Sequence, residues 1–211
     1  VKTADTNPAE LAELMVGRKV LLRVDKTPAK PRETVVEVRG LNVTDSAGVH
    51  RVKDVSFEIR GGEILGIAGV AGNGQSELLE VLGGYEKATG EILINGQAID
   101  LTGAHSDGQS RRKRGIAHVP EDRQNEGLIM DFQAWENMAF GYHHDPNYQK
   151  NPLLMDNRKI RDEPQAKMER FDVRPPNPAL GAENFSGGNQ QKIVLAREIE
   201  RNPDLLLIGQ P

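Results

Sequence analysis

Apolar and polar residues alternate along two early segments of the chain. Val35 to Val43 and Val55 to Ile59 place apolar residues at every second position over much of their length. A period of two is typical of strands with one buried face and one wet face, so these segments predict an antiparallel sheet. The run Ile64 to Ala68 is continuously apolar and bounded by glycines, and it predicts a strand that is buried on both faces.

The spacing of apolar residues then becomes helical in places. The pattern predicts a helix over 77–82, a strand over 91–94, a charged helix over 107–114 and a short strand over 116–119. Near the end of the chain it predicts a helix from Ser186 to about Arg201 and a buried strand over 205–208. Strands, loops and helices therefore follow one another as in an α/β domain.

Two stretches depart from this regular pattern. Residues 1–34 are polar and contain several prolines, which predicts a linker with one short helix opened by Pro8. Residues 132–180 hold six prolines and the single tryptophan of the chain, and they predict a mainly helical insertion. Three apolar residues recur there at helical spacing, either as core or as a groove for a partner helix: Phe132, Trp135 and Met138.

Composition excludes several classes of protein. A hydrophobic share of 37% and 22 glycines in 211 residues fit a globular chain that can bury a core. A net charge of −4 gives no bulk reason to bind nucleic acid, and the basic run 111–114 is more typical of a solvated helix face, so no nucleic-acid partner is expected. The absence of cysteine excludes disulfides and thiolate metal sites. No apolar run reaches the roughly 18 residues of a membrane helix, so any membrane role is peripheral.

Gly69 to Ser76 has the spacing of a phosphate-binding loop between a predicted strand and a predicted helix. Its glycines let backbone amides converge on phosphates, and the hydroxyl of Ser76 could bind magnesium. Gln75 stands where the pattern has lysine, which removes a charge-assisted hydrogen bond of roughly 1.5–3 kcal/mol. The nucleotide-binding candidates are Gly69, Gly72, Asn73, Gly74, Gln75 and Ser76.

Phe185 to Lys192 resembles the signature motif of ABC transporter ATPases, and its last four residues resemble the version found in simple-sugar and nucleoside importers. Val119 to Arg123 and the linker text Leu14 to Arg18 also resemble the second half of the double-domain ATPases that drive this uptake. The resemblance spans residues 35–211. It implies an α/β fold: a P-loop NTPase domain of the ABC type with an antiparallel β subdomain and a helical subdomain.

The resemblance also implies a domain layout. Residues 1–34 would be the linker between two ATPase halves, and residues 35–211 would be an ABC nucleotide-binding domain with its helical insertion at about 132–180. The chain would then be a truncated second half that lacks its C-terminal part. The family's switch histidine would lie beyond Pro211.

Several positions depart from the family pattern. Gly209 and Gln210 stand where an active ABC domain has an aspartate that supports magnesium and a glutamate that activates water, so no intact catalytic residue is expected. Loss of a general base costs about 10²–10⁴-fold in rate. Glu121 is the positional candidate for the loop that couples to a membrane subunit. Residues 44–47 offer no aromatic side chain to stack on adenine.

The resemblance therefore predicts an ATP-binding domain with a degraded site of its own and an intact signature. ATP and Mg²⁺ would bind weakly at its own loop, with Ser76 as a weak metal ligand. Four residues would contact the γ-phosphate held by the first ABC domain of the same polypeptide: Ser186, Gly187, Gly188 and Gln190. Transmembrane permease subunits would be the other partners, at the cytoplasmic face of the membrane. The alternative is a soluble ABC-type ATPase with no role in transport.

Overall fold

The computed structural model describes residues 6–16, 27–151 and 154–210. The chain divides into two units, Val1–Pro31 and Arg32–Pro211, which are described separately. Within the described ranges, no helix combines the length and the apolar character that a membrane span requires.

The first unit contains one short helix, α1 (Pro8–Val16). The side-chain oxygen of Asn7 accepts a hydrogen bond from the backbone N–H of Glu10 at 3.0 Å, and this bond satisfies one of the free amides at the helix start. The helix expected in the linker is confirmed. Residues 17–18 of the linker text that resembles the double-domain ATPases lie outside the described residues.

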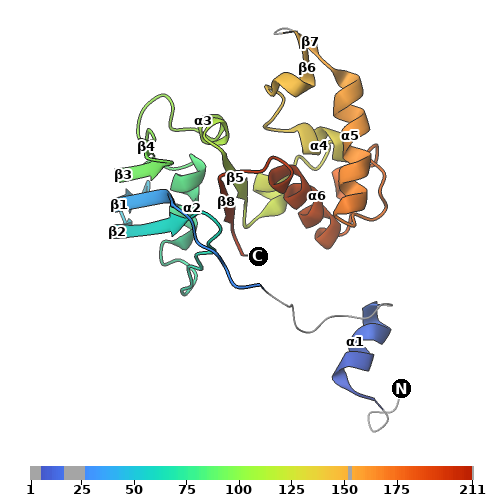
Figure 1. Ribbon diagram of the computed structural model, residues 1–211, viewed down its shortest axis with the longest axis horizontal. Helices are drawn as coiled ribbons and strands as arrows, with labels where there is room; N and C mark the ends of the chain where they lie inside the picture. The colour runs from blue at the N-terminus through green and yellow to red at the C-terminus, as the bar shows by residue number, and fades with distance from the viewer. Residues whose placement is uncertain (1–5, 17–26, 152–153, 211) are drawn as a thin grey trace. The chain divides into compact units, whose positions relative to one another are not determined.

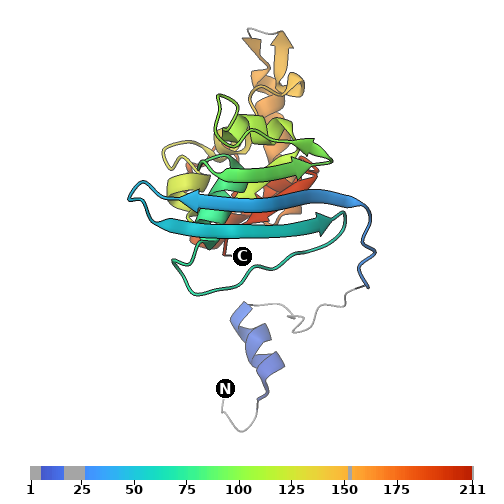
Figure 2. The same ribbon diagram turned by 90° about the vertical axis from the view of Figure 1, so that its left-hand side faces the viewer.

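The second unit begins with a four-stranded antiparallel sheet (Figures 1 and 2). Its strand order is β2-β1-β3-β4. Alternate residues of β1 face the helix α2 (Gln75–Gly83) and bury Val36, Val38 and Leu41 in one apolar cluster with residues of that helix. The predicted antiparallel sheet with one wet face is confirmed, and its strands are β1 (Thr34–Thr44), β2 (His50–Arg60), β3 (Thr89–Ile94) and β4 (Gln97–Ala98).

A parallel pair of strands lies beside this sheet and its helix (Figure 1). Strand β5 (Ile116–Val119) pairs with β8 (Leu205–Ile208), and Ile116 stands opposite Leu205. Helix α3 (Gly108–Lys113) precedes β5 and begins where the carboxylate of Asp107 accepts the N–H of Ser110 at 2.7 Å. Both strands lie where the apolar runs predict them.

The predicted strand over 64–68 is wrong. These residues form no strand, and the segment between β2 and α2 runs as an extended loop alongside β2 (Figure 2). The side chain of Ile64 is 95% exposed and that of Ile67 is 52% exposed. A strand needs a neighbouring strand to pair its backbone, and within the described part of the chain no strand pairs with this run. An apolar run therefore indicates a tendency to be buried, but it does not specify a strand with which the run could pair.

The region predicted as a helical insertion lies on the side of β5 and β8 away from the antiparallel sheet (Figure 1). Met138 is buried in the core of this region, whereas Phe132 is 37% exposed and Trp135 packs beneath the guanidinium of Arg161. The insertion contains α4 (Ala134–Ala139), a small hairpin of β6 (Gln149–Asn151) and β7 (Leu154–Met155), and α5 (Asn157–Arg170). Helix α6 (Gly187–Ile199) follows and packs against it.

The basic run 111–114 is not a uniformly solvated face. Arg111 is 2% exposed, and its guanidinium donates to the backbone oxygen of Asp100 at 2.7 Å. The interpretation of the run as a solvated helix face is therefore wrong for Arg111, because α3 turns that side chain inward to close the loop before it.

Candidate functional site

The phosphate-loop candidates form tight turns that lead directly into α2. Gly72 and Gly74 have φ angles of 86° and 98°, which side chains rarely permit. A Cβ on Gly74 would collide with the backbone oxygen of Arg51 in β2, so this position requires glycine. The segment 69–73 is exposed, and α2 begins at Gln75. The free amides at the start of α2 therefore face an open loop, as an anion site needs.

Gln75 lies back over this loop. A Cβ on Gly69 would collide with the side-chain amide nitrogen of Gln75. The glutamine thus covers the beginning of the loop with a neutral amide, which brings no positive charge to a phosphate. Glutamine is neutral, so the charge of the lysine in the motif pattern is absent here by residue type alone. The close approach of Gln75 to Gly69 shows that its side chain nevertheless reaches the loop.

The loop serine, the coupling-loop candidate and the end of β8 meet in space. The hydroxyl of Ser76 donates to the carboxylate of Glu121, with oxygen–oxygen distances of 3.1 and 3.2 Å. The side-chain amide of Gln210 donates to the same carboxylate at 3.3 Å. Three residues singled out by motif, separated by up to 134 positions, therefore form one cluster at the start of α2.

Glu121 fills the space that a side chain at position 209 would need. A Cβ on Gly209 would lie 2.5 Å from Cγ of Glu121 and 2.9 Å from its backbone nitrogen. The N–H of Gly209 donates to the backbone oxygen of Val119 at 2.9 Å, which continues the pairing of β8 with β5. With the backbone fixed in this way, Glu121 supplies the carboxylate at this point and position 209 supplies none.

The cluster contains oxygen donors of the kind that Mg²⁺ prefers. The hydroxyl of Ser76 and the carboxylate of Glu121 are both hard oxygen ligands, and magnesium usually takes one or two such groups beside water and substrate phosphate. Within the described ranges, no three His, Cys, Asp or Glu side chains are grouped so as to hold a metal ion. These residues therefore fit a magnesium ion that the nucleotide itself brings.

The signature residues lie at the start of α6. Ser186 occupies the N-cap position, but its hydroxyl accepts from the side chain of Asn189 at 2.9 Å instead of capping the helix backbone. Ser186 and Gly188 are exposed, and a Cβ on Gly188 would meet no atom within 4 Å. The surface above these residues is open, whereas Gly187 is covered by the guanidinium of Arg123.

Gln190 lies below this surface. It is 2% exposed, and its amide nitrogen donates to the backbone oxygen of Ala182 at 3.1 Å. Its side-chain oxygen accepts from Gln124 at 3.1 Å, in the single π-helical turn η2 (Arg123–Gly127) that follows Glu121. Both polar groups of Gln190 are thus used inside the chain, and the side chain ties the signature helix to the coupling-loop segment.

A second set of hydrogen bonds connects the signature helix α6 to the segment after Glu121, and the sequence did not predict it. Arg197 of α6 is 3% exposed, donates to the backbone oxygens of Gly127 and Asn137, and pairs with Glu198 at 2.7 Å. The hydroxyl of Tyr142 donates to Glu198 as well. Burial and the charge of Glu198 raise the pKa of Tyr142 well above its usual value. The sequence signal was a pair of adjacent opposite charges, Arg197 and Glu198, directly after the apolar run Ile193 to Ala196.

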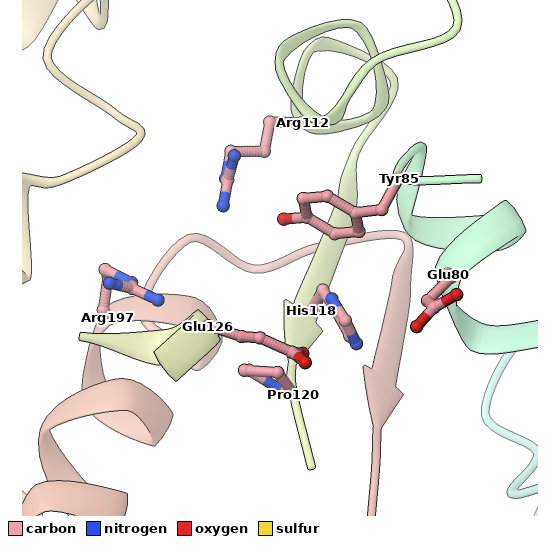
Figure 3. A pocket seen from close by; sticks show the side chains of 7 residues that line it. All are labelled: Glu80, Tyr85, Arg112, His118, Pro120, Glu126 and Arg197. Atoms are coloured by element: carbon pink, nitrogen blue, oxygen red, sulfur yellow. The ribbon is translucent and has the colours of Figure 1, made fainter. Parts of the chain in front are cut away.

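A cavity of about 360 Å³ lies between α2, β5 and α6 and was not expected from the sequence (Figure 3). Figure 3 shows Glu80 on one side, Arg197 on the other and His118 between them. Burial raises the pKa of Glu80 and lowers the pKa of His118, so both side chains are less charged there than in water. Its lining residues are Glu80, Tyr85, Arg112, His118, Pro120, Glu126 and Arg197.

Comparisons with known proteins identify the family and support the fold. The family model described as ABC transporter matches residues 52–211. The chain is 41% identical over 212 residues to the nucleoside import ATP-binding protein NupA of Lactococcus lactis subsp. cremoris, covering 100% of this chain and 41% of that protein. It is 40% identical to the guanosine import ATP-binding protein NupO of Bacillus subtilis, covering 98% of this chain and 40% of that protein. The chain thus spans about two fifths of the length of these relatives.

Solved structures support the fold class. The dimeric structure of MJ0796, a bacterial ABC transporter cassette, superimposes with a TM-score of 0.69 at 24% sequence identity. The alignment covers 83% of this chain and 74% of that chain. The predicted fold, an ABC-type nucleotide-binding domain with an antiparallel sheet and a helical part, is confirmed.

Proposed function

The chain belongs to the ABC transporter family, and from this premise we propose that it is the second nucleotide-binding domain of an importer ATPase for simple sugars or nucleosides. The names of the two import ATP-binding relatives support the substrate class. The linker text before β1 and the share of each relative that the chain covers support a place in a longer, two-domain protein.

In this proposal the signature acts on a nucleotide held by the first ABC domain of the same polypeptide. The observation that carries it is the contrast between an open, intact signature and a substituted site of its own. Ser186 and Gly188 are exposed at the start of α6, where backbone amides are free to meet a phosphate. Gln190 is buried, so its role is to hold the signature helix in place below the contacting residues.

The domain's own loop binds ATP and Mg²⁺ weakly and contributes little hydrolysis. Gln75 brings no charge to the phosphates, and Gln210 stands at the position of the general base without a titratable group. Ser76 and Glu121 would hold the nucleotide's magnesium, which neutralises phosphate charge when bound. In this chain the Glu121 carboxylate also accepts from Gln210, and this bond fixes its orientation in the free site.

The segment after Glu121 would transmit closure to transmembrane permease subunits at the cytoplasmic face of the membrane. This segment is tied to the signature helix through Gln124 and Gln190 and through Gly127 and Arg197. In this proposal these hydrogen bonds carry a displacement of the segment to α6, and a double-mutant cycle between Gln124 and Gln190 would measure the coupling.

Two substitutions in the complete two-domain protein test this division of roles. Gly188→Asp places a carboxylate beside the partner's phosphate, where like charges about 4 Å apart repel by about 4 kcal/mol at an effective dielectric of 20. ATP turnover should fall by roughly 10²-fold or more. Gly188→Ala is the matched control, because its Cβ would meet no atom within 4 Å. We prefer position 188 to 187, where the aspartate would lie against Arg123.

Ser76→Ala in this domain should lower turnover far less than Gly188→Asp, because the nucleotide that Ser76 touches is not the one hydrolysed. The measurement is the ATPase rate with and without the permease. If Ser76→Ala abolishes turnover and Gly188→Asp leaves it intact, the roles of the two sites are reversed. If the permease has no effect on the rate, the alternative of a soluble ABC-type ATPase replaces the transport function.

A further inference from the structure

The guanidinium of Arg123 lies against the backbone of the signature motif. A Cβ on Gly187 would be 2.5 Å from Nη2 of Arg123 and 3.4 Å from its Cζ. Arg123 opens the turn η2, two residues after Glu121, whereas Gly187 opens helix α6. A cation from the coupling-loop segment and the glycines of the signature therefore form one surface.

Hydrogen bonds from Asn125, and to a smaller extent the charge of Arg123, lower the pKa of Asp122, but no carboxylate among the described residues forms a salt bridge with the Arg123 guanidinium. Its Nε is buried and has no hydrogen-bond acceptor. The adjacent carboxylate of Asp122 is used to hold the turn, since it accepts from the N–H of Gln124 at 3.0 Å and from the side chain of Asn125 at 2.7 Å. A buried donor without an acceptor is uncommon in folded proteins. The Nε atoms of three further arginines share this state: Arg111, Arg112 and Arg201. A ligand is therefore indicated by the place of the Arg123 guanidinium beside the signature.

The surface beside Arg123 suits a phosphate. Ser186 and Gly188 flank it, and both are exposed. The thirteen-residue helix α6 points its N-terminus toward the same surface and adds a partial positive charge. A guanidinium binds phosphate through two parallel N–H···O bonds, which gives both charge and orientation.

We propose that Arg123 binds the terminal phosphate of the nucleotide that an opposing ABC domain presents to this signature. The inference rests on the proposed function, because it needs the signature to act in trans. The phosphate is held between the amides at the start of α6 and the guanidinium of Arg123. A side chain at position 187 would have to displace the flexible end of Arg123.

The first test follows the unmodified chain and does not depend on activity. Pyrophosphate is titrated into the 211-residue chain, and the Arg123 Nε–H resonance is followed by ¹⁵N nuclear magnetic resonance. The expected result is a saturable shift of this resonance, because a phosphate bound at Nη2 changes the electronic environment of the whole guanidinium. The backbone amide of Ser76 reports binding at the chain's own loop in the same titration. A shift at Ser76 with none at Arg123 overturns the proposal.

The second test uses variants of the complete two-domain protein. Arg123→Gln should lower kcat/KM for ATP by about 10- to 100-fold, the range expected for a lost charge-assisted hydrogen bond. Arg123→Lys should retain part of the activity, because lysine keeps the positive charge but cannot form the two parallel hydrogen bonds of a guanidinium. Arg174→Gln is the matched control: it removes the same charge close to α6, but Arg174 already pairs with Asp172 at 2.7 Å. This control should stay within about twofold of the unmodified protein.

The outcomes separate this inference from the proposed function. If Gly188→Asp abolishes turnover and Arg123→Gln does not change it, the signature acts in trans without Arg123 and the inference fails alone. If neither substitution changes turnover, the proposed function fails and the inference fails with it. If Arg123→Gln and Arg174→Gln lower the rate equally, the effect is one of general charge and the inference is wrong.

Discussion

The phosphate loop and the signature motif are both glycine-rich turns that open a helix, but their supports differ. The loop before α2 is exposed from residue 64 to residue 73, and Gln75 covers its beginning. The start of α6 rests instead on buried polar groups, with Gln190 at 2% exposure and Glu198 at 0%. The loop that has lost its charged residues is thus the one with little internal support. The motif that keeps its sequence is anchored in the core.

The buried ion pair offers the largest test of this contrast. Glu198→Ala leaves the guanidinium of Arg197 buried without its carboxylate, which should lower the free energy of unfolding by about 3–5 kcal/mol. Glu91→Ala is the control: Glu91 pairs with Arg39 at the surface, where side chains are 46% and 58% exposed, and the loss should stay below about 1 kcal/mol. Urea unfolding measures both. Equal losses would show that α6 does not depend on its buried support.

A glycine substitution in each region gives the next largest difference. Gly74→Ala forces a side chain into a positive φ and against the oxygen of Arg51, so it should destabilise the chain by about 2–4 kcal/mol. Gly188→Ala meets open space in the first turn of a helix and should change stability by less than about 1 kcal/mol, in the stabilising direction. Thermal and urea unfolding of the two variants test this. A neutral Gly74→Ala would mean that the loop adapts freely.

The smallest expected effect concerns the charge of Glu80, which lines the cavity between α2 and α6. Burial, and then the charge of Glu77, raise the pKa of Glu80, so protonation stabilises the folded state. The stability that protonation of Glu80 provides is present below its unfolded pKa and is lost as the pH rises through its folded pKa. Glu80→Gln should therefore be more stable than the unmodified chain at pH 7, and the difference should vanish on acidification below about pH 4.

Asp107→Asn should change the stability at neutral pH in the opposite direction to Glu80→Gln. Hydrogen bonds from the backbone and side chain of Ser110 lower the pKa of Asp107, so the charged form stabilises the fold. The variant should be less stable than the unmodified chain at neutral pH, and the difference should decrease as the pH falls through the folded pKa. Unfolding measured in urea from pH 7 to about pH 2 checks both signs, because the folded pKa of Asp107 lies below its ordinary value.

The sequence predicted elements better than it predicted their neighbours. Strands β5 and β8 lie where short apolar runs end at Pro120 and Gly209, because length and flanking turns specify a buried strand. The run at 64–68 is also apolar, but it has no pairing partner among the described residues, and Ile64, Leu65 and Ile67 are exposed. Apolar content expresses a tendency to be buried, whereas strand pairing depends on a second segment that periodicity does not identify.

The sequence likewise predicted residues of the candidate site better than the contacts between them. Motif spacing predicted Ser76, Glu121 and Gln210, and the structure places Ser76 and Gln210 within hydrogen-bonding distance of the Glu121 carboxylate. The contact of Arg123 with Gly187 was missed, because it joins segments 64 residues apart that carry no complementary charge. Contacts of a side chain with bare backbone leave no pattern in a single sequence.

Glu121 and Gly209 also restrict how this site can be altered by substitution. A new side chain at 209 would meet Cγ and the backbone nitrogen of Glu121, so Glu121→Gln keeps the obstruction and even truncation at Cβ leaves the nitrogen in the way. An aspartate at 209 would therefore need a shift of the main chain around 121 or 209, whichever side chain stands at 121. Because the two residues are in contact, we expect substitutions at 121 and 209 to be non-additive. Glycine at 209 is thus a condition of this backbone, and a carboxylate can be introduced there only together with a change in the neighbouring main chain.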